Sequence, residues 1–201
     1  MLKEKLTLQE YLSLGYIYLI VLGIISDVIY FRFLGVDILS YSAISDILLS
    51  PVNILTQSWL LSIVFIGLII FAYFYITIVL PKFHQKYRTK KWYNLTGNIE
   101  KADKRVSSIK ENKGIPYILF CIFCMFIGMG IGRGSKISKR IQTQDIEANY
   151  SVTFTNDLTK EVYVVGQNSS YLFYVLEGEK EVSVTSINPN IKVIQKISKD
   201  K

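Results

Sequence analysis

The chain has little cysteine and almost no histidine. Its only two cysteines, Cys121 and Cys124, lie inside an apolar run, so the polar segments carry no disulfide framework. His84 is the single histidine, so no His-based metal cluster or catalytic triad is possible without it. In its basic surroundings we expect a solvated side chain. These absences argue against an enzyme, and we expect no catalytic residue, no metal and no cofactor.

Charge is missing from three long stretches. Residues 59–80 form a run of 22 residues without a charged side chain, and residues 115–132 form a run of 18 without one. Residues 11–31 form a run of 21 that contains a single charged residue, Asp27. As a helix, the first of these would be about 33 Å long, enough to cross a hydrocarbon core of about 30 Å. We therefore predict an α-helical integral membrane protein with three membrane-embedded helices, in a membrane domain of residues 1–140. No A-x-A-like cleavage site follows residues 11–31, so we expect that run to stay as an anchor.

Positive charge is concentrated in one basic loop. Residues 81–114 contain ten Lys/Arg and three acidic residues, a difference of +7 that equals the net charge of the whole chain. The positive-inside rule places this loop and the amino terminus in the cytoplasm and residues 33–58 outside. Apolar residues spaced by three and four predict a short amphipathic helix over residues 99–110. The side chains expected to contact the membrane surface are Lys82, Lys86, Arg88, Lys90, Lys91, Trp92 and Tyr93.

The same basic and aromatic composition occurs in nucleic-acid-binding segments. A position next to a membrane helix is sufficient by itself to predict this composition. The expected partner is therefore membrane lipid and not nucleic acid. We expect the cytoplasmic (inner) membrane of a bacterium. The carboxyl-terminal module would lie outside if the third helix spans. Four basic residues directly after that helix disfavour an outside location: Arg133, Lys136, Lys139 and Arg140. A re-entrant third element would instead keep the module inside.

Residues 36–55 mix apolar and polar side chains. An interfacial amphipathic helix fits this composition, and a short re-entrant helix is the alternative. Pro51 is expected to end or kink any helix near Ser50. Ionisable residues inside apolar runs often mark functional sites. Asp27 is therefore a candidate intramembrane polar site, with Arg32 as a nearby pairing partner.

Residues 145–201 show alternating apolar and polar positions, broken by turn-rich segments. The pattern predicts five short strands, in a small all-β module able to fold alone. Closure into a barrel would remove exposed strand edges. On strand count and spacing, residues 150–198 resemble a small SH3- or Sm-like β-barrel, which implies a five-strand, barrel-like fold. The residues expected on one buried face are Val162, Val164, Phe173, Val175, Val182 and Val184.

Glycines and cysteines cluster in the third apolar run. Two overlapping small-xxx-small pairs, Gly128/Gly132 and Gly130/Gly134, would lie about 200° apart on a helix and predict close packing or oligomerisation. An extended, carbonyl-lined filter is the alternative. Cys121 and Cys124 form a C-x-x-C pair, but a membrane thiol oxidoreductase would need a second pair to relay electrons.

Three functions follow from these patterns. The first is a homo-oligomeric, channel-like or scaffold/sensor membrane protein whose β module assembles or recognises a protein partner. The second is a membrane anchor that holds a binding module and recruits a partner. The third is a membrane thiol oxidoreductase that uses the two cysteines.

Overall fold

The computed structural model describes residues 7–56, 59–90, 99–111 and 114–197. These residues form two compact units, Met1–Ile54 with Phe126–Lys201, and Leu55–Met125. The helical elements are α1 (Leu8–Phe33), η1 (Ile38–Tyr41), α2 (Ile44–Thr56), α3 (Trp59–Phe74), the π-helical turn η2 (Tyr75–Val79), α4 (Leu80–Tyr87), α6 (Ile99–Glu111) and α7 (Ile115–Gln142). The strands are β1 (Tyr150–Phe154), β2 (Thr159–Gln167), β3 (Tyr171–Leu176), β4 (Ser183–Ser186) and β5 (Ile191–Lys196).

Three helical stretches are long and apolar enough to cross a membrane. They are Leu8–Phe33, Ser62–Tyr87 and Ile115–Gln142, with 26, 26 and 28 residues. The expectation of three such helices is therefore confirmed for length and composition. All three extend beyond their uncharged runs. α1 begins with a capping box, in which Glu10 N–H donates to Thr7 Oγ1 and Thr7 N–H donates to the Glu10 carboxylate at 2.6 Å.

The second long helix continues past Pro81, where the basic loop was expected to begin. A proline inside a regular α-helix clashes with the carbonyl four residues before it. Here the π-helical turn η2 comes directly before, and Leu80 N–H donates to Tyr75 O, five residues back. The wider turn gives the proline ring room, so the helix runs on to Tyr87. Helix α6 confirms the amphipathic helix predicted over residues 99–110.

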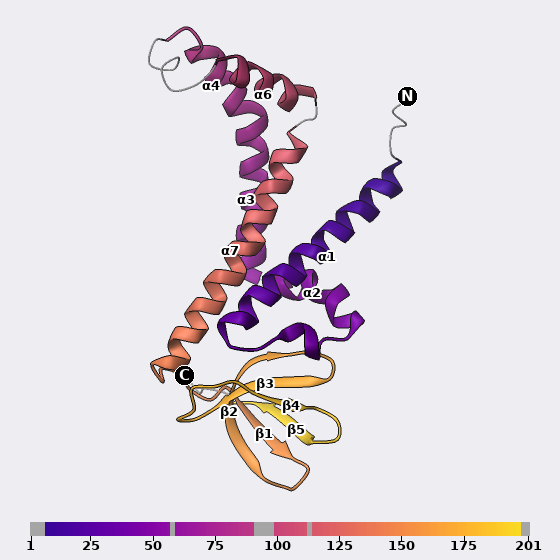
Figure 1. Ribbon diagram of the computed structural model, residues 1–201, viewed down its shortest axis with the longest axis vertical. Coiled ribbons are helices and arrows are strands. Elements are labelled where there is room, and N and C mark those ends of the chain that lie inside the picture. Colours follow the sequence, from indigo (N-terminus) through magenta and orange to yellow (C-terminus); the bar gives the residue numbers. More distant parts are fainter. Residues whose placement is uncertain (1–6, 57–58, 91–98, 112–113, 198–201) are drawn as a thin grey trace. The chain divides into compact units, whose positions relative to one another are not determined.

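The five predicted strands are all present and form one antiparallel sheet in the order β4-β3-β2-β1-β5 (Figure 1). The barrel expectation is wrong in its closure, because β4 and β5 are the two edges and do not pair. In a closed barrel the inner face is buried by the barrel's own strands. In this sheet both faces carry apolar clusters, and one of them is covered by helices.

The residues expected to share one buried face are divided between the two faces. Val162 packs in a cluster with Val152, Leu172 and Tyr174, and Val164 lies against that cluster. Phe173, Val175, Val182 and Val184 belong to the opposite cluster. Val162 and Val164 pair across the strand with Leu176 and Tyr174, so they share a face with those residues and not with the alternate residues Phe173 and Val175. All four central residues of β3 are buried, as a strand with two covered faces requires.

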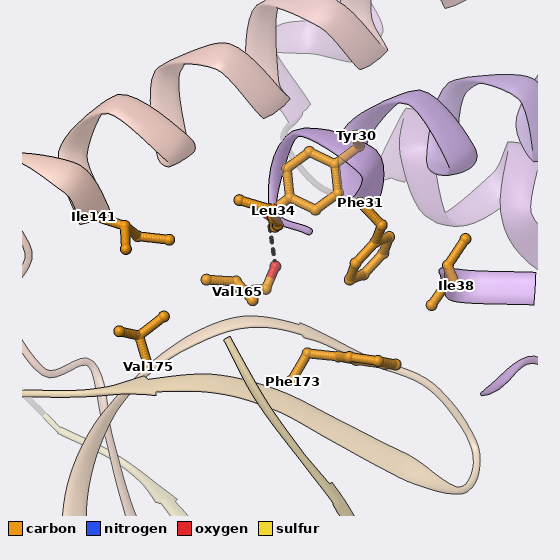
Figure 2. Packing of buried hydrophobic residues seen from close by; sticks show 8 residues of the cluster. All are labelled: Tyr30, Phe31, Leu34, Ile38, Ile141, Val165, Phe173 and Val175. Carbon is orange, nitrogen blue, oxygen red and sulfur yellow. Dashed lines mark hydrogen bonds between the residues drawn. The ribbon is translucent and has the colours of Figure 1, made fainter. Parts of the chain in front are cut away.

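The cluster on the helix-facing side joins the sheet to the ends of α1 and α7 (Figure 2). Tyr30, Phe31 and Leu34 come from the last turns of α1 and its cap, Ile38 from η1 and Ile141 from α7. They pack against Val165, Phe173 and Val175 of the sheet. The rings of Phe31 and Phe173 lie 5.0 Å apart. The dashed line in Figure 2 is the bond from Tyr30 Oη to the Val165 carbonyl, at 2.8 Å.

Candidate functional site

The glycines of α7 fall on two different faces of one continuous helix. α7 is helical throughout residues 115–142, so the extended-filter alternative for its glycines does not hold. A Cβ added at Gly130 would lie 2.6 Å from the Ser26 carbonyl oxygen of α1. A Cβ at Gly134 would lie 2.8 Å from the Phe33 ring and 3.0 Å from the Tyr30 carbonyl oxygen. This glycine pair therefore lets α7 approach the backbone of α1 closely.

The other pair, Gly128 and Gly132, has no such neighbour. A Cβ at either position would meet nothing within 4 Å among the described residues. These two positions lie one turn apart on α7 and leave a smooth strip of helix surface. Sequence spacing found both pairs, but could not tell which one contacts α1.

Asp27 bonds to α2. Ser50 Oγ donates to Asp27 Oδ2 at 2.5 Å. The pairing with Arg32 expected from proximity in the sequence is not among the ion pairs of the described residues. Because Asp27 and Ser50 are 23 residues apart, no local spacing rule could have joined them.

Helices α1 and α2 also approach closely beside this bond. Pro51 lies inside α2, so of the two expected effects, ending the helix or kinking it, the first does not occur. A Cβ at Gly23 would lie 2.7 Å from Pro51 N, so the bare glycine makes room for the proline ring, which is buried. Tyr16 Oη donates to the Leu48 carbonyl at 3.1 Å in the same contact. Packing on α1 therefore stabilises α2 where proline removes a backbone bond.

Two of the four basic residues at the end of α7 are held by tyrosines. The Arg133 guanidinium lies 4.8 Å from the Tyr30 ring centre, and that of Arg140 lies 5.9 Å from Tyr163. Such cation–π contacts stabilise a folded protein by about 0.5–1 kcal/mol at exposed sites and more when desolvated. Neither role was predicted. In the sequence both residues served only as evidence on which side of the membrane the module lies.

The basic loop contains a clasp between α4 and α6, in the second unit. Asp103 Oδ1 lies 2.8 Å from His84 Nε2, and Asp103 Oδ2 accepts from Arg88 at 2.7 Å. The bond with His84 and the charge of Arg88 hold the pKa of Asp103 below its ordinary value. The expectation of a solvated histidine is wrong, because His84 is 5% exposed. The helix that continues through Pro81 brings it against α6.

Four of the seven predicted surface residues lie on α4 or directly after it. Lys82, Lys86 and Arg88 are on or at the end of α4, and Lys90 follows it. The Lys86 ammonium lies 5.5 Å from the Tyr87 ring centre. Lys91, Trp92 and Tyr93 fall outside the described residues.

The C-x-x-C pair lies on α7. Both thiols are free, with Cys121 partly buried and Cys124 exposed. The redox reading stays a hypothesis.

Comparisons with family models, curated proteins and solved structures find no match to this chain. Any function must therefore be argued from the residues themselves.

Proposed function

We propose that the chain is a small integral membrane scaffold or sensor that self-associates and holds its β module, in a fixed position on two helix ends, for assembly or recognition. The observation that carries this proposal is the apolar core shared by α1, η1, α7 and the sheet. A module on a flexible tether would bury its apolar residues against itself. This module buries Phe173 and Val175 completely in a cluster completed by helical residues.

Membrane insertion is supported by the apolar surface of the long helices. On α3, Ile70 and Phe71 are 62% and 64% exposed, and many other large apolar side chains of α1 and α3 are equally uncovered. Contiguous apolar surface of this extent is rare on a soluble monomer, and in lipid it needs no further cover.

The shared core also supports a common direction for two helices. The carboxyl ends of α1 and α7 both pack on the same sheet. This is what two helices that cross in the same direction would do. It supports a spanning α7 over a re-entrant one. It also supports a module on the side reached by α1, opposite the amino terminus that we propose to be cytoplasmic.

Self-association is proposed through the open Gly128/Gly132 strip. Small residues let helix backbones approach closely in lipid, where the hydrophobic effect does not bring helices together. The test is the native mass of the purified chain in nanodiscs, compared with the 23.1 kDa of one chain. We expect an oligomer for the wild type and a lower mass for Gly132→Leu. Gly15→Leu on α1 is the matched control, because a Cβ added at Gly15 also meets nothing within 4 Å.

A monomeric wild type would overturn the scaffold proposal and favour the anchor with a binding module. The open sheet supports that second candidate, because the edge strand β5 offers unpaired backbone groups to an added strand. A channel-like role would require the oligomer first.

A further inference from the structure

A cavity of about 560 Å³ lies where α1 and α7 meet the sheet. Its wall includes the end of α1 from Arg32 to Gly35, the last turns of α7, and the β3–β4 connection at residues 180–182. α1 and α7 are the two helices proposed to span the membrane in the same direction. The cavity would therefore lie at the depth of the lipid headgroups.

Four polar side chains of the wall are without a partner in the described part of the chain. Arg32, Ser138, Lys180 and Glu181 all line the cavity, and none of them takes part in a hydrogen bond or salt bridge there. Arg140 of α7, by contrast, donates to the Asp145 carbonyl at 2.8 Å. The four side chains without a partner share one cavity wall.

These groups have the chemistry of a zwitterion site. A guanidinium and an ammonium, from Arg32 and Lys180, suit a phosphate oxygen, and the Ser138 hydroxyl adds a donor. The Glu181 carboxylate suits a cation that can donate hydrogen bonds. The carbonyl end of α1 also borders the cavity and adds negative potential there, which favours the cation of a zwitterion.

We propose that this cavity binds the headgroup of a phospholipid that carries a phosphodiester and a primary ammonium, as phosphatidylethanolamine does. Arg32 and Lys180 bind the phosphate, and Glu181 binds the ammonium. Phe33, which lines the cavity and is half-exposed, would contact the start of the acyl chains. The inference rests on the proposed membrane location.

The test uses the full chain in nanodiscs of equal phosphatidylethanolamine and phosphatidylcholine, with retained lipids counted by native mass spectrometry. The quaternary ammonium of choline cannot donate a hydrogen bond to Glu181, so we expect ethanolamine lipid to be retained about tenfold over choline lipid. Arg32→Gln and Lys180→Gln should each lower retention about tenfold. Glu181→Gln should abolish the preference between the two lipids. Lys139 is an exposed charged residue of α7 outside the cavity wall, so Lys139→Gln should change neither the retention of lipid nor the preference between the two lipids.

A second measurement separates a lipid from a soluble phosphodiester. Glycerophosphoethanolamine, which has the headgroup without acyl chains, is added to the loaded chain. It should displace the lipid only at concentrations far above those at which the lipid itself binds. Displacement at equal concentrations would overturn the lipid assignment, and equal retention of both lipids by the wild type would overturn the site.

Flotation of the same variants with vesicles distinguishes the two proposals. A chain that floats but retains both lipids equally refutes only this inference. A chain that does not float refutes the proposed membrane function. Lys180 belongs to the β3–β4 connection and to neither helix, so Lys180→Gln tests the site even if Arg32→Gln fails to fold.

Discussion

Replacing Gly130 with alanine tests the close contact between α7 and α1. The added Cβ would lie 2.6 Å from the Ser26 carbonyl oxygen and 3.2 Å from Ile29 Cβ. Carbon–oxygen contacts of this kind are normally about 3.3 Å or longer, so the two helices must separate by roughly 0.7 Å. The obstacle is backbone, which cannot swing aside as a side chain can.

The magnitude follows from overpacking. Inserting one methyl group into a filled contact destabilises a protein by about 1–3 kcal/mol. Gly132→Ala on the same helix is the matched control, because its methyl group meets nothing within 4 Å. Both variants gain the same intrinsic helix propensity, about 1 kcal/mol, so this gain cancels in the comparison. Gly130→Ala should therefore be about 1–3 kcal/mol less stable than Gly132→Ala.

Equilibrium unfolding in mixed micelles of dodecyl maltoside and SDS, followed by circular dichroism, measures this difference. A thiol at Ser26, in a chain with both natural cysteines replaced by serine, should also react faster in the Gly130→Ala background. Equal stability and equal thiol reactivity of the two glycine variants would refute the packing argument.

Three further expectations concern single side chains. Tyr30→Phe removes a hydroxyl that donates to a buried carbonyl and should lower stability by about 1–3 kcal/mol, whereas Tyr171→Phe, whose hydroxyl has no bond in the described structure, should not. Because the bond from His84 lowers the pKa of Asp103, the stabilisation of the α4–α6 contact is present above the ordinary aspartate pKa of about 3.9 and is lost as the pH falls through the lower folded value. The protection of α6 amides against hydrogen exchange, relative to their intrinsic rates, should fall below pH about 4 in the wild type, and Asp103→Asn should show that low protection at every pH. A single cysteine at Lys90 should resist an impermeant thiol reagent in intact cells, and ready labelling would overturn the cytoplasmic assignment of the loop.

Local patterns predicted the elements better than their ends. Uncharged runs and period-two alternation depend on only a few neighbouring residues, and all three long helices and all five strands are present. The helix through Pro81 depends on a π-helical turn that no spacing rule indicates. The two-faced sheet depends on helices more than 100 residues away in the chain, such as the segment with Phe31.

The candidate site shows the same division. The spacing of Gly128 to Gly134 predicted close packing, but which pair faces α1 is decided by how α7 is rotated. The rarity of a charge in an apolar run marked Asp27. Its partner Ser50 comes from another helix and follows only from the fold.

The isolated module, residues 145–201, gives the sharpest test of the shared core. Strand count and alternation predict that it folds alone. The structure supplies an opposing argument, because the fragment would expose Val165, Phe173 and Val175, which are buried against helices. Exposing three such side chains removes about 1.5–3 kcal/mol each, or roughly 5–9 kcal/mol. A domain of this size has a total stability of about 3–9 kcal/mol, so the loss is comparable to all of it.

The shared core therefore predicts that the fragment gives no cooperative monomeric melt by circular dichroism. Replacing Phe173 with serine in the fragment should improve its solubility, because the exposed face becomes less apolar. In the full chain the same change should lower stability by about 3–5 kcal/mol, the usual loss on truncating a buried aromatic side chain. A fragment that is monomeric and melts cooperatively without the helices would show that the sheet is stable by itself. The contact with α1 and α7 would then be a docking surface between two independent parts, and the fixed position proposed for the module would no longer follow from its folding.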